Sequence, residues 1–309
     1  MKATFETENV KYEKIKFKVN FDLPLEISIP LNFNLNQPNN YNVPYASATH
    51  YQDGQFIGNV EMGGNCNFDT ISIIPHCNGT HTECIGHITK EKQSINKILT
   101  TFHKLCLVIS IKPIEANNIK NPVLDYYPFD FENIKNDKVI NYELIINSIK
   151  ATNGVSLVDL NGKSYILYNG IKIDSLAIRT LPNGDTKTDI DYMTSPPAYL
   201  TNDAVLFLNE INIQNLLLDL PSIDKQFDQG KLSSHHIFWG LEQETNTISD
   251  EKLNDIYFIE NYYHKTITEM IYINDHILDG VYLLNLQIAP FELDASPSKP
   301  LLYNIKIVI

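Results

Sequence analysis

The pattern that most constrains the fold of this chain is a strand, helix and strand in its middle third. Ser175–Thr180 is a largely apolar run that predicts a buried strand. A predicted helix begins at Thr201 and reaches Glu210, and Asn215–Leu220 predicts a second strand. Because such a connection joins parallel strands, the sequence predicts a mixed α/β fold around a partly parallel sheet.

Other segments predict further elements around this unit. Leu105–Ile111 and Ser164–Tyr168 predict buried strands, and Asn141–Lys150 predicts a short helix. Thr70–Ile74 predicts a strand by its β-branched content, and this strand should end at the proline that follows. The sequence has neither an internal repeat nor a low-complexity linker, so we expect a single domain over residues 1–309 with loop insertions.

The composition narrows the classes of partner. With 309 residues, of which 43% are hydrophobic, the chain can bury a large core without cross-links. Its 24 Lys and Arg against 37 Asp and Glu give a formal charge of -13, which disfavours nucleic acid and acidic membrane surfaces. We therefore expect a small-molecule substrate, with neither nucleic acid nor membrane as a partner.

Cysteine usage and the first residues bear on the compartment. Four cysteines with no Cys-x-x-Cys pair favour a reducing compartment. Acidic residues at the start occupy the place of the apolar core of a signal peptide. No uninterrupted run approaches the ~20 apolar residues that a membrane helix requires. These features predict a cytoplasmic protein.

Residues 75–87 have the composition of a metal site. His76, His81, Glu83 and His87 lie within this short segment, around a Gly-Thr pair. Imidazole nitrogen and carboxylate oxygen suit divalent ions such as zinc or manganese. Ligands that are close in sequence also lower the entropy cost of closing a coordination shell. The segment therefore predicts a metal site, with hydrolysis as the leading function.

This segment resembles the hallmark of the cyclase family of metal-dependent hydrolases, which is typified by bacterial kynurenine formamidase and includes isatin hydrolase. The family pattern reads His-x-Gly-Thr-His-x-Asp-x-Pro-x-His, and Gly79-Thr80-His81, Glu83 and His87 fall in step with it, while Ile85 replaces its proline. Three further blocks are similar to the family in the same order: Ile27–Leu31, Asp219–Asp224 followed by His235-His236, and Asp279–Tyr282 followed by Leu293–Pro297.

The resemblance implies a swivelling β/β/α fold that holds two divalent ions, with zinc as the first choice and manganese or iron as alternatives. Glu83 would bridge the two ions, and His87 occupies the place of the family's general acid and base. Family members commonly pair, which implies a homodimer. The metal ligands that the resemblance implies are His76, His81, Glu83, His235 and Glu269.

The chain departs from the family pattern at the first ligand and at the bridging one. Glu83 replaces an aspartate, and one residue is added between His76 and Gly79. On a strand, Cys77 would share a face with His81, whereas His76 would need a bulge to join them. We favour His76 because the preceding proline also matches the family, and Cys77 is the alternative.

A second departure concerns spacing in the last third. His235 and Glu269 lie farther apart than their counterparts in the family, which an insertion at about residues 240–264 explains. We expect this insertion to reshape the mouth of the pocket. Glu269 lies in an apolar stretch that we interpret as helical, where a buried carboxylate is costly unless a charge such as a metal ion compensates it.

The predicted function is a metal-dependent amidohydrolase that acts on C–N bonds other than peptide bonds. A metal-bound hydroxide would attack a small, aromatic amide, formamide or cyclic amide, as in an arylformamidase. His87 could move the proton to the leaving nitrogen, since the pKa of an ordinary histidine lies near 6.5. The alternative is a non-catalytic ligand-binding or metal-binding protein on the same scaffold.

Two further groups are expected to support the site. Asp219, Ser222 and Asp224 are typical turn and cap residues that would brace it. Trp239 and the tyrosines that follow it suggest a pocket wall for an aromatic ligand.

Overall fold

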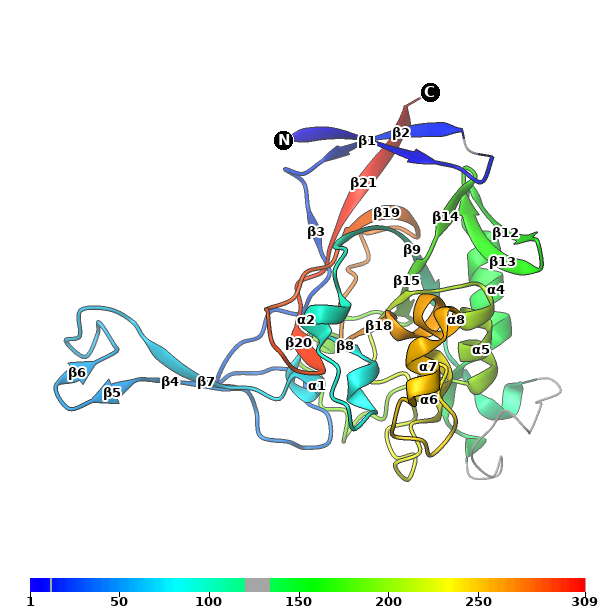
Figure 1. Cartoon of the computed structure of the whole chain (residues 1–309). Helices are drawn as coiled ribbons and strands as arrows, with labels where there is room; N and C mark the ends of the chain where they lie inside the picture. The colour runs from blue at the N-terminus through cyan, green and yellow to red at the C-terminus, as the bar shows by residue number, and fades with distance from the viewer. Residues whose placement is uncertain (12, 120–133, 309) are drawn as a thin grey trace.

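The computed structural model describes residues 1–11, 13–119 and 134–308. Within these ranges, eleven strands form one large sheet that runs through the molecule (Figure 1). Its strands, in spatial order, are β1 (Lys2–Glu8), β2 (Lys14–Asn20), β21 (Leu301–Val308), β19 (Gly280–Asn285), β9 (His103–Ile111), β15 (Ser175–Thr180), β17 (Asn215–Leu218), β18 (Thr266–Glu269), β8 (His81–Cys84) and β20 (Ala295–Pro297), while β3 (Leu25–Glu26) pairs with β21.

The centre of this sheet is parallel and buried. Strands β9, β15, β17 and β18 run parallel to one another, and β8 is antiparallel to β18. Every residue of β15 and β17 is buried, as expected for parallel strands that are covered on both faces. The predicted strand, helix and strand are present as β15, α5 (Asn202–Glu210) and β17, so the expectation of a mixed α/β fold is confirmed.

Helices cover one face of the central strands. Helix α4 (Tyr142–Ala151) contacts β9 and α5, and α5 contacts α6 (Ser233–Phe238). Figure 1 shows these three helices on one side of the sheet. The side chain of Asn141 accepts a hydrogen bond of 3.2 Å from the backbone N–H of Leu144 and so caps the start of α4. The largest core lies between these helices and the sheet, where apolar side chains from both layers are buried together.

Small sheets and short helices complete the fold. One small sheet contains β12 (Val155–Leu160), β13 (Lys163–Tyr168) and β14 (Ile171–Ile173), and another contains β10 (Ile114–Glu115), β11 (Lys138–Ile140) and β16 (Tyr199–Leu200). The short helices are α1 (Pro75–Asn78), η1 (Ile85–His87), α2 (Ile95–Ile98), η2 (Ala116–Asn118), η4 (Asp185–Thr188), α7 (Asp250–Asn254), α8 (Ile256–Phe258) and η5 (Ile259–Tyr263).

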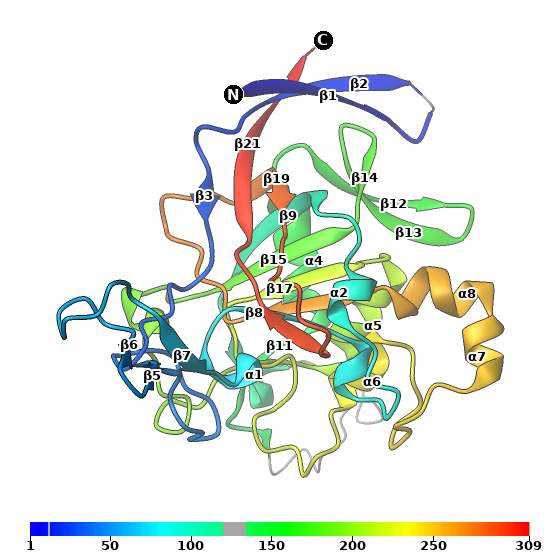
Figure 2. The same cartoon turned by 60° about the vertical axis from the view of Figure 1, so that its left-hand side comes forward.

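One segment projects from the body as an arm, which we define as residues 47–72 (Figures 1 and 2). It contains β4 (Ser47–His50) paired with β7 (Asp69–Ser72), and β5 (Gln52–Asp53) paired with β6 (Phe56–Ile57). The strand predicted over Thr70–Ile74 is thus present as β7, but it ends before the predicted boundary and all its residues are exposed. Among the described residues, no helix is long and apolar enough to cross a membrane.

Candidate metal centre

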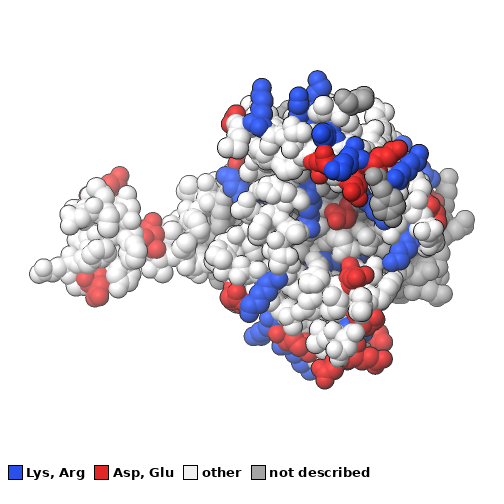
Figure 3. Space-filling model, turned by 45° about the horizontal axis from the view of Figure 1, so that its top comes forward, with Lys and Arg blue, Asp and Glu red and all other residues white. Residues whose placement is uncertain are grey.

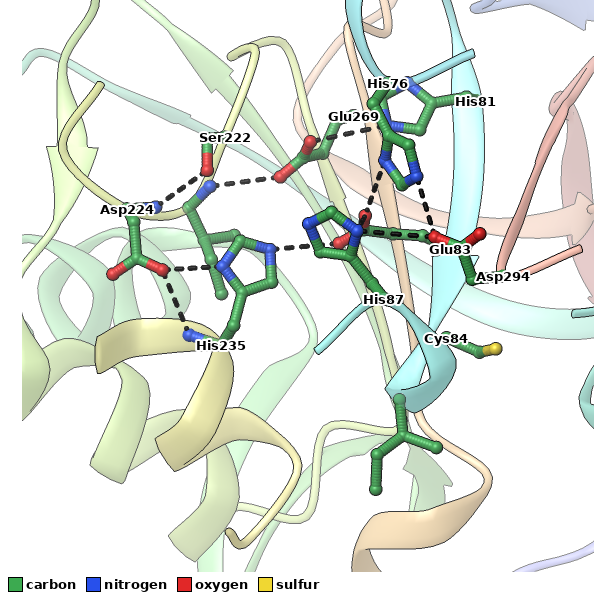
Figure 4. A network of polar contacts seen from close by, with 12 residues as sticks. His76, His81, Glu83, Cys84, His87, Ser222, Asp224, His235, Glu269 and Asp294 are labelled. Carbon is green, nitrogen blue, oxygen red and sulfur yellow. Dashed lines mark hydrogen bonds and ion pairs between the residues drawn. The ribbon is translucent and has the colours of Figure 1, made fainter. Parts of the chain in front are cut away.

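The candidate site lies where β8 begins and its antiparallel neighbour β18 ends. His81 pairs with Glu269 across these two strands, and Glu83 pairs with Ile267. Because side chains alternate along a strand, His81 and Glu83 point to the same face of the sheet. Figure 4 shows both side chains meeting residues from α1, η1 and α6 at this place.

Glu83 is at the centre of the cluster and is 1% exposed. Its Oε1 lies 3.0 Å from Nε2 of His235, and its Oε2 lies 3.1 Å from Nδ1 of His76. Nδ1 of His87 is 3.8 Å from the same Oε2 atom. The carboxylate of Glu83 therefore lies between His76 and His87, from the first third of the chain, and His235, from the last third.

His81 and Glu269 form the deep side of the cluster. Nε2 of His81 lies 3.4 Å from Oε2 of Glu269, and both side chains are buried. Nδ1 of His81 is 3.0 Å from the carbonyl oxygen of Gly79, which fixes the ring and directs Nε2 into the cluster. The backbone N–H of Ile223 donates to Oε1 of Glu269 at 3.1 Å.

The interpretation of Glu269 as part of a helix is wrong. Thr266–Glu269 is strand β18, which lies between β17 and β8 in the central sheet. Its β-branched residues fit this position, and a strand in the middle of a sheet has its backbone hydrogen bonds satisfied by both neighbours. The carboxylate is nevertheless buried, as the sequence analysis expected.

The first histidine is brought into the cluster by a helical turn instead of a strand. The expected extended geometry over residues 77–81 does not occur, because α1 occupies Pro75–Asn78 with its proline in the first helical turn. This turn places Nδ1 of His76 against Glu83 and Nε2 against Asp294. No bulge is needed, and the groups of potential ligand atoms among the described residues contain His76 but not Cys77.

His235 is held by Asp224 from behind. Nδ1 of His235 lies 2.6 Å from Oδ2 of Asp224, and the backbone N–H groups of Ser234 and His235 donate to the same carboxylate. This contact leaves Nε2 of His235 free to face Glu83. Asp224 thus braces the site as predicted, and the hydroxyl of Ser222 in turn accepts from the backbone N–H of Asp224 at 3.1 Å.

Trp239 does not line an open pocket. Its side chain is fully buried in the main core, where its indole N–H donates to the carbonyl oxygen of Lys265 at 3.1 Å. Its ring packs beside that of His235, with 5.4 Å between centroids. The suggestion of an aromatic pocket wall is therefore wrong for this residue, which instead supports the position of His235.

Asp294 is a site residue to which the sequence analysis assigned no role. Its Oδ2 lies 2.9 Å from Nε2 of His76 and 3.4 Å from Nδ1 of His87. The only sequence signal was its place in the closing block Leu293–Pro297. The rings of His76 and His87, both 26% exposed, lie 4.2 Å apart beside it and form the solvent-facing edge of the cluster.

Burial and neighbouring charges together set the pKa values in the cluster, and at Glu83, His76 and His235 they act in opposite directions. Burial would raise the pKa of Glu83, but the surrounding imidazoles hold it well below its usual range. Burial would lower the pKa of His235, but Asp224 and Glu83 hold it well above its usual range. Burial also opposes the charge of His76, whose pKa Asp294 and Glu83 raise to about 10. Burial and the charge of Glu83 raise the pKa of Glu269.

The donor set fits divalent cations. Nε2 of His81 and Oε2 of Glu83 are buried without a hydrogen-bond partner among the described residues, although each lies within ion-pair distance of an oppositely charged group. A shared cation would satisfy both atoms. Three groups have ligand atoms within 4.8 Å of one another: His76 with His81 and Glu83, His76 with His87 and Asp294, and Glu83 with His87 and His235.

These groups agree only partly with the implied ligand sets. The set of His76, His81 and Glu83 is brought together as expected. In the second set, Glu83 and His235 are close to each other and to His87, whereas the ion-pair contact of Glu269 is with His81.

A cavity of about 460 Å³ opens beside His87. Its lining includes Lys90, His236, Glu244 and Asn246. The backbone N–H of Lys90 donates to the carbonyl oxygen of Asn246 at 2.8 Å, which joins residues 240–264 to the segment after η1. The segment that we expect to be an insertion thus reaches the wall of the space next to the cluster.

Comparison with known proteins agrees with this architecture. The family model described as "Putative cyclase" matches residues 25–225. No curated protein sequence matched this chain. An isatin hydrolase bound to the product analogue thioisatinate has a similar structure, with a TM-score of 0.54 and 12% identity over 92% of each chain.

Two further solved structures share the fold. A "potential metal-dependent hydrolase with cyclase activity" is 14% identical with a TM-score of 0.51, covering 91% of this chain and 98% of that one. Isatin hydrolase A from Labrenzia aggregata is 12% identical with a TM-score of 0.51, covering 91% of this chain and 93% of that one. The chain belongs to the cyclase family, and its fold is that of the family's metal-dependent hydrolases.

Proposed function

We propose that this protein is a metal-dependent amidohydrolase that cleaves a small aromatic amide, formamide or cyclic amide, with an arylformamidase-like reaction. The observation that carries the proposal is the pair of buried atoms, Nε2 of His81 and Oε2 of Glu83, which lack hydrogen bonds inside a cluster of imidazoles and carboxylates. The isatin hydrolase structures support the choice of an aromatic cyclic amide as one substrate class.

The proposed ligands are those that the resemblance implied. His76, His81 and Glu83 would hold one ion, and Glu83, His235 and Glu269 would hold the other, with zinc as the first choice and manganese or iron as alternatives. When bound, a divalent cation lowers the pKa of water and polarises a carbonyl oxygen. Asp224 keeps Nε2 of His235 directed at Glu83, so its role is to orient a ligand.

His87 is the proposed acid and base. It lines the cavity next to the cluster, and its Nδ1 faces Asp294 at 3.4 Å. A ring at the edge of the cluster can accept a proton from water on one side of a substrate and donate it to the leaving nitrogen. Asp294 would hold the ring of His87 in place during this transfer.

The direct test is substitution of His81 with alanine. We expect bound zinc, measured by elemental analysis, to fall and hydrolysis of isatin and of an aryl formamide to be lost, because the substitution removes one proposed ligand nitrogen. His276→Ala, which removes an exposed histidine in a loop, should retain both properties. Full metal content in wild-type protein without turnover of amides, formamides or lactams would favour the non-catalytic alternative.

We further propose that the protein forms a homodimer through the arm. Several large apolar side chains are exposed there, including Phe56, Val60, Met62, Phe68 and Ile71. The arm carries acidic residues but no Lys or Arg, as Figure 3 shows for the visible face. Replacement of Phe56 and Phe68 by serine should shift the mass measured by light scattering to that of a monomer, whereas a monomeric wild-type protein would contradict the proposal.

We also propose a cytoplasmic location, with neither nucleic acid nor membrane as a partner. All four cysteines are free, with Cys66 exposed and the other three buried. A free exposed thiol is typical of a reducing compartment. Fractionation of cells that express the protein would test this location.

A further inference from the structure

A loop in the first part of the chain is fixed to the helical turn that carries His76. The backbone N–H of Asn40 donates to the carbonyl oxygen of Cys77 at 3.2 Å, and Nδ2 of Asn78 donates to the carbonyl oxygen of Pro44 at 3.2 Å. Both asparagine side chains are buried. Because Cys77 directly follows His76 in α1, these two bonds hold the backbone that carries this proposed ligand.

The same loop, residues 39–44, is also fixed to the segment after Asp224, and we call it the bridging loop. Nε2 of Gln226 donates to Oδ1 of Asn40 at 2.7 Å, and the hydroxyl of Tyr41 donates to the carbonyl oxygen of Gln226 at 2.8 Å. Gln226 is 8% exposed and Asn40 is 1% exposed. Water therefore competes little for the hydrogen bond between the two amide side chains.

The segment around Gln226 holds the helix that carries His235. Oδ2 of Asp224 is 2.6 Å from Nδ1 of His235, and Oδ2 of Asp228 accepts from the backbone N–H of Leu232 at the start of α6. Gln226 lies midway between these two aspartates in the chain. A shift of Gln226 would therefore move the carboxylate that orients His235.

The backbone of the bridging loop adopts an uncommon conformation. Tyr41 and Asn42 have φ angles of 58° and 51°, which lie in the left-handed region. Such a conformation costs free energy for a tyrosine and persists only where the surroundings fix it. The backbone of Asn39 supplies a further anchor, because its N–H donates to the carbonyl oxygen of Ile190 at 3.0 Å and its carbonyl oxygen accepts from Tyr192 at 3.0 Å.

We propose that Asn40 and Gln226 are positioning residues that set the distance between His76 and His235. Their hydrogen bond joins two segments that are 186 positions apart in the sequence. Glu83 lies between the two imidazoles, 3.1 Å from one and 3.0 Å from the other, so a small shift on either side opens one of these contacts. This role rests on the proposed function, which assigns both histidines as metal ligands.

The test compares two buried glutamines in the full-length protein. Gln226→Leu removes the hydrogen bond to Asn40. Gln37→Leu is the matched control, because Gln37 is 2% exposed and its side chain donates to the carbonyl oxygen of Ala46 at 3.0 Å and accepts from its backbone N–H at 2.8 Å. Ala46 lies outside the bridging loop. Both variants should be less stable in urea, since each leaves buried partner groups unsatisfied.

Only Gln226→Leu should affect the two imidazoles. In the metal-free protein, we expect the ¹⁵N signals of His76 and His235 to shift in this variant and to stay unchanged in Gln37→Leu. The affinity for zinc, measured by competition with a chelator, should fall about tenfold in Gln226→Leu, as for other residues that orient a ligand. Signals that do not change in Gln226→Leu, or that change equally in both variants, would overturn the positioning role.

A milder variant decides the question if Gln226→Leu does not fold. Tyr41→Phe removes only the hydroxyl of a side chain that is 45% exposed. We expect the same imidazole signals to shift and the affinity for zinc to fall about threefold. Shifted signals would support the positioning role even if wild-type protein hydrolyses no amide. Unchanged signals would overturn it even if wild-type protein is an active hydrolase.

Discussion

Two buried ionic groups lie at the carboxyl edge of the central parallel strands, and they differ in kind. One is the cluster around Glu83, where imidazoles face carboxylates and two buried atoms lack hydrogen bonds. The other is the pair of Lys187 and Asp219, where an ammonium group compensates one carboxylate oxygen through a direct contact. In both groups the burial of charge costs free energy, yet only the first group offers donor atoms that suit a metal.

This difference shows that the neighbouring basic group determines whether a buried carboxylate can take part in a metal site. An ammonium group has no lone pair while it is charged, so Lys187 adds no ligand atom beside Asp219, and their contact stabilises the fold. An imidazole that loses its proton becomes a ligand, so the same carboxylate chemistry becomes a metal site beside histidines.

The largest effect is expected at the carboxylate that bridges the cluster. Glu83→Gln keeps the shape of the side chain but removes the charge that both proposed ions share. We expect bound metal to fall to traces and hydrolysis to fall by ~1000-fold or more, since a metal supplies several kcal/mol of transition-state stabilisation. Elemental analysis and single-turnover assays measure the two effects. Retention of two equivalents of metal would show that Glu83 does not bridge.

The second effect concerns stability at the other ionic group. Asp219→Ala leaves Lys187, which is 14% exposed, without its carboxylate partner. We expect a loss of about 3–5 kcal/mol in the free energy of unfolding, measured with urea. The double variant Asp219→Ala with Lys187→Met should recover part of this loss, because the uncompensated charge is gone. A loss below about 1 kcal/mol in the single variant would mean that solvent screens the pair.

A third effect is the pH dependence of a buried lysine that has no carboxylate partner in the described contacts. Burial lowers the pKa of Lys265 to about 7, while its Nζ donates to Oδ1 of Asn209 at 2.6 Å. Between pH 7 and the ordinary lysine pKa, the unfolded chain binds more protons, so stability rises with pH. Lys265 therefore destabilises the fold below pH 7. This destabilisation disappears as the pH rises towards the pKa of free lysine.

Lys265→Met isolates this contribution. The stability advantage of the variant over wild type should be about 4 kcal/mol larger at pH 6 than at pH 10, since each pH unit between the two pKa values corresponds to about 1.4 kcal/mol. Urea unfolding of both proteins at the two pH values gives the difference. A stability gap that does not change with pH would show that Lys265 keeps an ordinary pKa in the folded protein.

The smallest effect is expected at the rim of the metal cluster. Asp294→Asn keeps a polar group beside His76 and His87 but removes the negative charge that pairs with them. We expect metal affinity, measured by competition with a chelator, to fall about 10–100-fold, as for other residues that orient a ligand. A loss as complete as that of Glu83→Gln would instead make Asp294 a direct ligand.

The predicted elements and the observed ones agree best where burial is uniform. The unit around β15, α5 and β17 was predictable because each strand is a short apolar run and the helix has a polar residue at its start. The arm strand β7 was predicted by its β-branched residues, but it is exposed. Composition alone does not reveal whether a strand joins the central sheet or a separate hairpin, since that depends on which strand pairs with it.

The site residues were predicted better than their local structure. His76 and Glu269 are present in the cluster, yet one lies on a helical turn that was expected to be extended and the other on a strand that was expected to be helical. Short apolar stretches are ambiguous by periodicity, and the pairing of β18 with both neighbours decides the outcome. Asp294 was missed because a single aspartate in a loop carries no signal of its own.

By itself, the sequence determined the chemistry that this protein can offer: three histidines and a carboxylate within residues 76–87, and the matching blocks that mark the cyclase family. Only the tertiary structure decided that these side chains converge with His235 and that Asp294 borders them. The physical reason is that residue types and their spacing are local properties. The distance between atoms far apart in the chain depends on strand order and register, which the whole fold sets at once.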